Sequence, residues 1–217
     1  MTRDMELDVI YEDGDIVVVD KPAGVIVHPA PGHEDFALTD ELVRRYPGMA
    51  GVGSRERPGV VHRLDIGTSG VMVFARTQRA YLALRRQFEA HDRVEKKYLA
   101  VVHGAPAERS GTIDAPVGRD RLSAVTHWTV LGRREGVSLV EFRIETGRMH
   151  QIRIHAAKMG CPVVGDSAYG DSARDRRLRR RPGRPLLHAV ELSFLHPATG
   201  RRVTFAAPPP DDIVYAV

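Results

Sequence analysis

Residues 60–77, VVHRLDIGTSGVMVFART, combine two apolar, β-rich runs with a short polar turn. The runs at 60–61 and 71–74 predict a strand on each side of that turn. Asp65 lies in the turn, and a carboxylate on a loop between two buried strands is held in place while it can still reach a ligand. The same carboxylate can instead accept backbone N–H bonds and shape its own turn. This stretch by itself favours the second interpretation.

The length and composition of the chain set the limits of the fold. Its 217 residues are 42% hydrophobic and 28% charged, which suits one large domain or two tightly joined halves. A single cysteine, Cys161, excludes a disulfide framework and a cysteine-based metal cluster. Its apolar surroundings favour a core position over a nucleophile. We find no apolar run of about 20 residues and no signal-peptide core in residues 1–15, so we expect a cytoplasmic protein without membrane contact.

One segment makes the protein basic. Residues 174–184, RDRRLRRRPGR, carry seven arginines and one aspartate, a charge of +6, whereas the whole chain carries +4 and the remainder therefore −2. Like charges packed so closely repel one another unless solvent or an anion separates them. Two interpretations stay open, a solvated surface loop and an arm that contacts nucleic-acid phosphates.

The hydrophobic pattern predicts more strands than helices. Residues 8–21 read as two strands around an Asp13-Gly14 turn, and 16–19 are too continuously apolar for a strand with one wet face. The other predicted elements are helices at 38–46, capped near Thr39 or Asp40, at 78–90 after a Thr77 cap, and within 147–160; a surface loop at 47–59; and strands at 96–103, 111–117, 124–131, 137–146, 187–195 and 201–206. Short links between most strands favour an α+β domain with a mixed, mainly antiparallel central sheet.

The common catalytic motifs are missing from the sequence. It contains no HExxH, no phosphate-binding glycine loop and no GxSxG, so we expect neither a metal nor a cofactor. Asp65 remains as a candidate nucleophile or general base. Tyr98 can offer a ring for stacking and a phenol for proton transfer, or it can be a buried strand aromatic. Arg148 or Arg153 can pair with a carboxylate and keep it ionised, or can bind surface phosphate or helix carbonyls.

Five stretches, in one order, resemble the RluA family of RNA pseudouridine synthases. HRLD followed by TSG, with TGRMHQIR downstream, is the specific combination. The stretches are YEDGDIVVVDKPAGVIVHP at 11–29, RPGVVHRLDIGTSGVMVFART at 57–77, KKYLAVVHG at 96–104, ETGRMHQIRIHAAKMGCPVVGDSAYG at 145–170 and LLHAVELSFLHPATGRRVTFAAP at 186–208. The resemblance implies a pseudouridine synthase fold with flanking helices, in two halves around a cleft. We expect residues 1–217 to form a single catalytic domain without an N-terminal S4 domain.

The resemblance also assigns roles to residues of this chain. Asp65 would be the catalytic residue, and Arg153 would form an ion pair with it. Tyr98 would lie against the target base and assist the proton step, and Arg63 would fill the space that the flipped uridine leaves. The other positions expected to bind RNA are His62, Arg148 and Lys21.

The identity of the RNA is left open by the sequence. Moving uracil from an N1 to a C5 attachment involves no redox change, which agrees with the expectation of no cofactor. We expect a uridine of 23S ribosomal RNA as the substrate, with transfer RNA as the alternative. A ribosome-assembly factor that binds RNA and whose chemistry is secondary is a further hypothesis. We expect a monomer.

Overall fold

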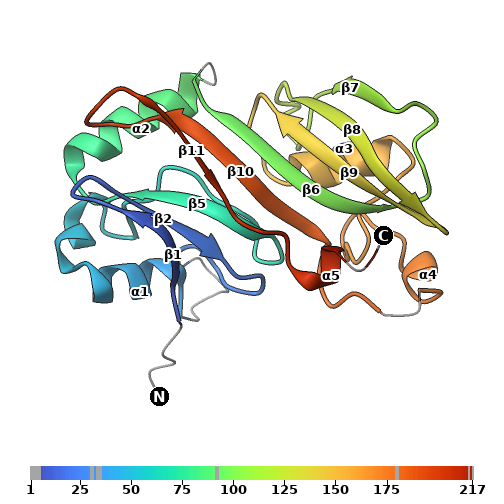
Figure 1. Ribbon diagram of the computed structural model, residues 1–217, viewed down its shortest axis with the longest axis horizontal. Helices are drawn as coiled ribbons and strands as arrows, with labels where there is room; N and C mark the ends of the chain where they lie inside the picture. Colours follow the sequence, from blue (N-terminus) through green and yellow to red (C-terminus); the bar gives the residue numbers. More distant parts are fainter. Residues whose placement is uncertain are drawn as a thin grey trace. The chain divides into compact units, whose positions relative to one another are not determined.

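The computed structural model describes residues 6–29, 32, 36–90, 93–178, 181–214 and 216 (Figure 1). The chain forms two compact units. Unit 1 comprises Met1–Val94 and Glu191–Ala207, and unit 2 comprises Glu95–Val190 and Pro208–Val217. The chain returns from unit 2 to unit 1 within strand β10 (Leu187–Leu195).

Unit 1 is built on a sheet whose strands follow the order β1-β2-β5-β10, with β11 paired to β10. The strands are β1 (Asp8–Glu12), β2 (Ile16–Lys21), β5 (Ser69–Ala75) and β11 (Arg202–Ala206). The pairs β1–β2, β2–β5 and β10–β11 are antiparallel, and the first confirms the two strands predicted around the Asp13-Gly14 turn. Residues 16–19 are fully buried on both faces of the sheet, as predicted, and β2 lies between β1 and β5.

The helices of unit 1 are α1 (Leu38–Arg45) and α2 (Gln78–Ala90). Helix α2 begins as predicted, since the Thr77 hydroxyl accepts the Ala80 N–H at 3.1 Å. The predicted cap of α1 is wrong: the N-cap is Ala37, whose N–H donates to the Asp40 carboxylate in the first turn at 2.8 Å. The expected loop at 47–59 contains a 3₁₀ turn η1 (Pro47–Gly51) and the short strands β3 (Gly53–Ser54) and β4 (Arg57–Pro58).

The predicted strand at 60–61 is wrong. Val60 makes only an isolated bridge to Phe74, and the regular strand β5 begins later, at Ser69. Gly59, at φ +70°, turns the chain there, and its carbonyl accepts the Ala75 N–H at 2.9 Å. The chain bends at 61–62 directly after this bridge, so Asp65 follows irregular backbone and precedes a strand.

Unit 2 is built on a second run of strands in the order β10-β6-β9-β8-β7. These are β6 (Glu95–His103), β7 (Ser110–Asp114), β8 (Val125–Arg134) and β9 (Val137–Ile144), and the pairs β6–β9, β8–β9 and β7–β8 are antiparallel. A register shift between Val130 and Gly132 lets β8 continue to Arg134, three residues beyond the predicted end. An α+β fold with a mainly antiparallel sheet is thus confirmed.

The helices of unit 2 are α3 (Gln151–Lys158) and the single turns α4 (Ser172–Asp175) and α5 (Asp211–Val214). Cys161 is buried, as predicted, and burial raises the pKa of its thiol. The arginine-rich segment starts in α4 and continues as irregular chain; Arg179 and Arg180 lie outside the described residues. No helix of the described ranges is both long enough and apolar enough to cross a membrane.

Candidate active site

Asp65 lies on a closely braced loop of unit 1. Its side chain is half-buried, and its carbonyl accepts the Thr68 N–H at 3.0 Å to close a turn. The next carbonyl, that of Ile66, accepts the Gly24 N–H at 2.7 Å and the Lys21 ammonium at 3.3 Å. The KPAG loop after β2 therefore holds the backbone directly beside the carboxylate, which favours a fixed geometry for Asp65.

Lys21 is the centre of this brace. It is fully buried at the end of β2, and besides the Ile66 carbonyl its Nζ donates to the carbonyls of Pro22 and Val25, both at 2.8 Å. Burial of an ammonium is costly unless its three donors are satisfied, so this set of acceptors explains why a lysine is tolerated here. The placement differs from the expected contact with RNA, and it makes Lys21 a support of the Asp65 loop.

His62 and Arg63, the two residues before Leu64, face different surroundings. The His62 Nε2 accepts the Val73 N–H at 3.1 Å, and its ring stacks on Phe88 with centroids 4.7 Å apart. His62 therefore braces the segment against β5 and α2, with Nε2 as the accepting nitrogen. Arg63 is exposed and forms no ion pair or side-chain hydrogen bond with another described residue, so its guanidinium is accessible to a ligand.

Tyr98 and Lys96 lie on one buried face of β6 in unit 2. Both are at least nine-tenths buried, and Tyr98 is paired in register with Phe142 of β9. Burial, and secondarily the charge of Arg148, lowers the pKa of Lys96 to about 8. Lys96 was not among the predicted site residues, although residues two apart on a strand point to the same face and so share one environment.

Arg153 is held by Asp166, which was not among the predicted site residues. The guanidinium donates from Nε at 2.7 Å and from Nη2 at 2.8 Å to the two carboxylate oxygens. Burial alone would raise the pKa of Asp166, but hydrogen bonds from Arg153 and from the N–H groups of Tyr169 and Ala168 lower it below the usual range. The Tyr169 ring adds a cation–π contact, 5.3 Å from the Arg153 guanidinium carbon.

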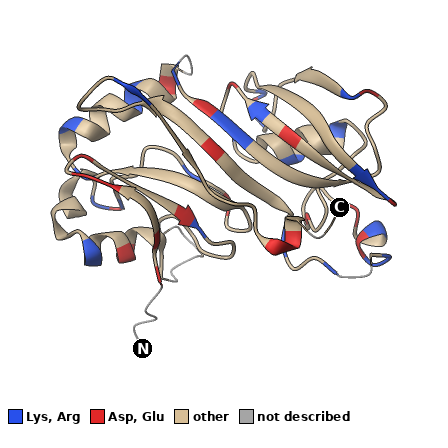
Figure 2. Cartoon of the chain, viewed as in Figure 1, with Lys and Arg blue, Asp and Glu red and all other residues tan. Residues whose placement is uncertain are grey.

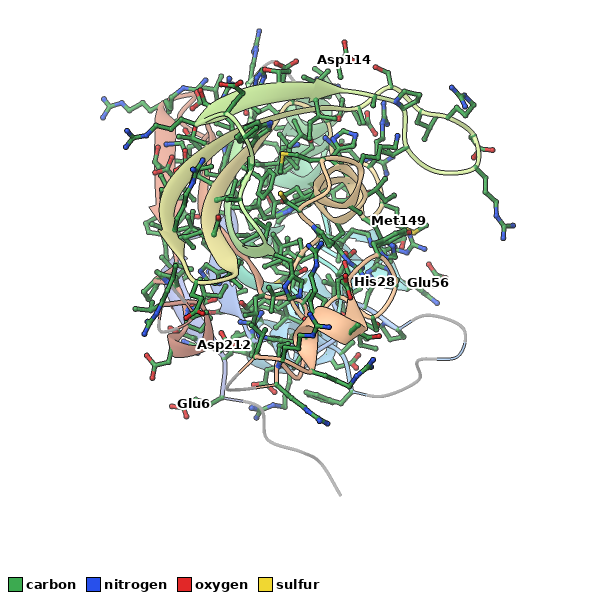
Figure 3. All side chains as sticks on the ribbon, turned by 90° about the vertical axis from the view of Figure 1, so that its right-hand side faces the viewer. Glu6, His28, Glu56, Asp114, Met149 and Asp212 are labelled. Carbon is green, nitrogen blue, oxygen red and sulfur yellow. The ribbon has the colours of Figure 1, made fainter. Side chains whose placement is uncertain are left out.

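The turn before α3 is fixed by Gln151. Its Oε1 accepts from the Arg148 N–H at 3.0 Å and from the Thr146 hydroxyl at 2.7 Å. His150 lies in the left-handed region at φ +56°, a strained conformation for a non-glycine residue, with Nδ1 3.1 Å from the Tyr169 hydroxyl. This turn leaves Met149 67% exposed at the surface (Figure 3).

Comparisons with known proteins agree with these motifs. Residues 15–158 match the family model described as RNA pseudouridylate synthase. The ribosomal large subunit pseudouridine synthase D of Xanthomonas campestris pv. campestris is 45% identical, over 97% of this chain and 68% of its own. The uncharacterised RNA pseudouridine synthase YlyB of Bacillus subtilis is 42% identical, over 98% of this chain and 72% of its own.

The chain belongs to the RNA pseudouridylate synthase family. The predicted resemblance to the RluA family, and with it the enzyme class, an RNA-modifying isomerase, is therefore confirmed. Among solved structures, human RNA Pseudouridylate Synthase Domain Containing 4 superimposes with a TM-score of 0.79 at 27% identity, over 96% of this chain and 91% of that one.

The candidate residues of this synthase fall into two sets. Unit 1 carries Asp65 with Lys21, His62 and Arg63, and unit 2 carries Tyr98, Arg148 and Arg153. The ion pair between Asp65 and Arg153 stays a prediction. Among the described residues, no group of three or more His, Cys, Asp or Glu side chains is placed to hold a metal ion.

Proposed function

We propose that this synthase converts a uridine of large-subunit ribosomal RNA to pseudouridine and that Asp65 is its catalytic residue. The observation that carries the proposal is the half-buried carboxylate on a loop held by the fully buried Lys21. The target follows the names of relatives: ribosomal large subunit pseudouridine synthases D from three bacteria are 37%, 40% and 45% identical to this chain.

The reaction needs one carboxylate and a means of moving one proton. The N1–C1′ bond breaks, the C5–C1′ bond forms, the proton on C5 leaves and N1 gains a proton, so no electrons are gained or lost. An ionised Asp65 can attack ribose C1′ or C6 of the base, or promote elimination at the sugar. All three routes require the carboxylate to be charged and fixed, and the brace from Lys21 provides the second condition.

Arg153 and Tyr98 complete the proposed site from unit 2. A guanidinium beside Asp65 would keep the carboxylate ionised in a site closed to water. The bidentate contact with Asp166 fixes the plane of that guanidinium, so its remaining donor directions are fixed as well. The Tyr98 ring supplies an apolar surface for the uracil, and its phenol assists the transfer of the C5 proton.

Base flipping is the role proposed for Arg63. A uridine that leaves its stack costs roughly a few kcal/mol of unstacking and unpairing. Arg63 is exposed and has no ion-pair partner among the described residues, so its guanidinium is available to occupy the vacated space. The proposed result is a lower cost of flipping and a separate contribution to RNA binding.

The first test is Asp65→Asn, with Asp114→Asn on the exposed strand β7 as a matched control. We expect Asp65→Asn to abolish pseudouridine formation while folding and RNA binding persist, and Asp114→Asn to stay within about twofold of wild type. Wild-type activity in Asp65→Asn would refute the catalytic role. The readout is pseudouridine mapping on RNA from cells that lack the chromosomal gene and express wild type or one of the two variants.

The same mapping identifies the target. We expect one or a few 23S sites to lose pseudouridine when the gene is deleted and to regain it with wild type but not with Asp65→Asn. Loss confined to transfer RNA would overturn the ribosomal target and leave the chemistry intact. Rescue of a ribosome-assembly defect by Asp65→Asn as complete as by wild type would instead support an assembly factor whose chemistry is secondary.

A further inference from the structure

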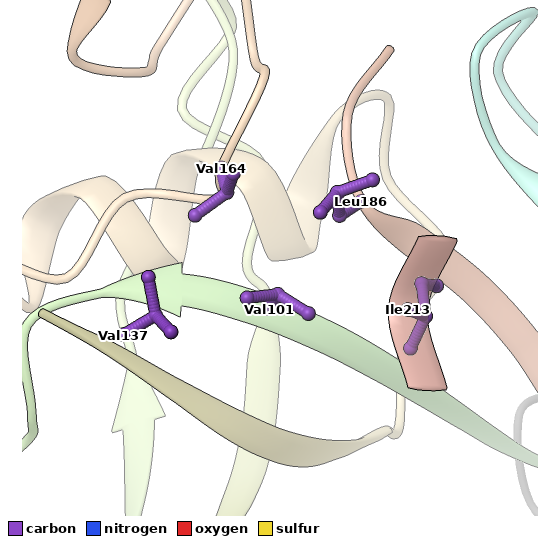
Figure 4. Close-up of a cluster of buried hydrophobic side chains, with 5 residues drawn as sticks. All are labelled: Val101, Val137, Val164, Leu186 and Ile213. Carbon is purple, nitrogen blue, oxygen red and sulfur yellow. The ribbon is translucent and has the colours of Figure 1, made fainter. Parts of the chain in front are cut away.

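Unit 2 contains a cavity of about 1140 Å³ beside the arginine-rich segment. Its apolar floor is formed by a cluster of buried aliphatic side chains from β6, β9 and the segments before β10: Val101, Val137, Val164 and Leu186 (Figure 4). Four arginines also line it, Arg134, Arg174, Arg177 and Arg181, and we call it the arginine cavity. They come from the end of β8, from α4 and from the chain that follows α4, and Figure 2 shows Lys and Arg positions in blue around α4.

The arginines of this region divide into anchored and available ones. Arg184 forms a bidentate pair with Asp212 of α5 at 2.8 and 2.7 Å, and Arg174 pairs with Asp171 at 3.2 Å. The other three cavity arginines, Arg134, Arg177 and Arg181, are exposed and form no ion pair with another described residue. Available guanidinium groups around an apolar floor favour an anionic ligand that also has an apolar part.

The wall that carries these arginines is fixed to the core of unit 2. One carboxylate oxygen of Asp175, in α4, accepts from His103 Nε2 at 2.7 Å and from the Gly165 N–H at 3.0 Å. His103 is 99% buried. On the other side of the segment, the Arg184–Asp212 pair ties the chain to α5. The described parts of the segment are thus anchored to the rest of unit 2 at two points, Asp175 and Arg184.

We propose that the arginine cavity binds single-stranded RNA of the substrate. Ligand pockets for one small molecule measure roughly 300–1,000 Å³, so about 1140 Å³ suits more than one nucleotide. Phosphates would contact the available arginines, and base faces would lie against the aliphatic floor.

Three carboxylates also line the cavity, Glu135, Asp211 and Asp212, and Asp212 is already bound by Arg184. A carboxylate can accept a hydrogen bond from an exocyclic amino group of a base, so these residues suit bases and the arginines suit phosphates.

This inference rests on the proposed action on RNA, but not on Asp65, and it is tested by binding alone. The variant replaces Arg134, Arg177 and Arg181 by Gln. The charge-matched control replaces three exposed arginines elsewhere, Arg86, Arg143 and Arg201. The probes are a fluorescein-labelled, non-self-complementary 12-nucleotide RNA, the duplex formed with its complement, and a 12-residue polyglutamate peptide, each titrated at several salt concentrations.

For the single strand, we expect the cavity variant to bind about tenfold more weakly and the slope of log K against log salt to fall by about 2, since each lost phosphate contact removes roughly 0.7. The control variant should keep most of the wild-type slope. Equal losses in the two variants, or an unchanged slope in the cavity variant, would overturn the proposal. A loss confined to the duplex, or to polyglutamate, would overturn it in favour of a paired RNA or an acidic protein segment.

The outcome is independent of catalysis. If Asp65→Asn leaves pseudouridine formation intact, the catalytic proposal fails while the cavity variant still reports on RNA binding. If the cavity variant binds single strands like wild type, the cavity proposal fails while Asp65 is unaffected. Urea denaturation of each variant confirms that it is folded before titration.

Discussion

Arg153 and Asp166 form a buried, bidentate ion pair, with Nε–Oδ2 and Nη2–Oδ1 distances of 2.7 and 2.8 Å. Asp166 also accepts the N–H groups of Ala168 and Tyr169, at 2.9 and 3.0 Å. One carboxylate thus orders both the guanidinium of the proposed site and the backbone that follows it. Removing one partner of such a pair leaves the other charge buried without compensation, which is costly.

We therefore expect Asp166→Ala to lower the free energy of unfolding by about 3 to 5 kcal/mol. Asp166→Asn keeps an oxygen for the backbone donors but loses the charge, so its cost should be smaller, about 1 to 3 kcal/mol. Urea denaturation at pH 7 measures both, with Asp120→Asn as an exposed control. If Asp166→Ala were as stable as the control, the pair would have no structural role.

The same pair should be sensitive to acid. Because the folded-state pKa of Asp166 is lowered, its stabilisation is present above the unfolded value near 4 and is lost as pH falls through the folded pKa. The stability difference between wild type and Asp166→Asn should therefore be constant from about pH 5 to 7 and shrink below about pH 4. A difference that grew on acidification would contradict this sign.

The charge of Lys96 should destabilise the folded protein at neutral pH, and this destabilisation should decrease as pH rises. Its folded-state pKa of about 8, against the usual 10.5, means that the protonated form is disfavoured in the folded chain, chiefly by burial. Below pH 8 the full cost is present, and it is relieved as pH rises from about 8 to 10.5. Lys96→Met should therefore be more stable than wild type at pH 7 by about 2 to 3 kcal/mol.

Urea denaturation of wild type and Lys96→Met at pH 7, 8, 9 and 10 checks this trend, because the groups common to both proteins cancel in the difference. The advantage of Lys96→Met should narrow steadily above pH 8. Lys158→Met, on the exposed end of α3, is the control and should show no such trend. A difference independent of pH would mean that Lys96 is charged at no cost.

Asp20 of β2 provides a test in unit 1. Burial, and secondarily the cross-strand neighbour Asp8, raises the pKa of Asp20 to about 6. The folded state therefore holds this proton more tightly, and the associated stability is full below about pH 4 and is lost as pH rises through 6. Since Asp20 is partly exposed, solvent screening reduces the effect.

Asp20→Asn should accordingly stabilise unit 1 by about 1 to 2 kcal/mol at pH 7, and the gain should vanish as pH falls from 6 to 4. Asp8→Asn removes only the repulsion, so its effect should be smaller, and the double variant should gain less than the sum. Additive effects would show that the two carboxylates do not interact. Thermal unfolding across that pH range is the measurement.

The parts predicted from the sequence were those decided by local pattern. The continuous apolar run of β2 and the Thr77 cap of α2 are each features of a single element, and both predictions were confirmed. The predicted strand at 60–61 failed because the chain bends at 61–62, directly after the single bridge between Val60 and Phe74. The hydrophobic pattern of a few neighbouring residues cannot predict such a feature of the tertiary structure.

The candidate site shows the same division. The turn at Asp65 was visible in its Gly-Thr-Ser neighbours, because turn chemistry is local. The roles of Lys21 and Asp166 were not, since the contacts that define them join Lys21 to Ile66, 45 positions away, and Asp166 to Arg153, 13 positions away. An Arg or Lys in a motif predicts a positive charge at that position. Only the three-dimensional structure shows which acceptors already take the hydrogen bonds of that side chain.

Gly165, immediately before Asp166, offers a sharp test of how rigid this region is. It has φ +76°, and a Cβ there would lie 2.1 Å from the Arg184 carbonyl oxygen and 2.7 Å from the Pro182 Cβ. Gly160, at the end of α3, has nearly the same φ, +77°, and no heavy atom within 4 Å of the corresponding position. Alanine at Gly160 therefore adds only backbone strain, which we expect to lower the free energy of unfolding by about 1 to 2 kcal/mol.

At Gly165, alanine adds a clash with backbone as well, and we expect the free energy of unfolding to fall by about 3 to 5 kcal/mol in total. The clash must move either the chain at 182–184 or Asp166, so Gly165→Ala should also lower the rate of pseudouridine formation, whereas Gly160→Ala should not. Urea denaturation and single-turnover assays of the two variants measure both effects. Equal stability losses would show that the chain at 182–184 yields freely and that it does not hold Asp166 in place.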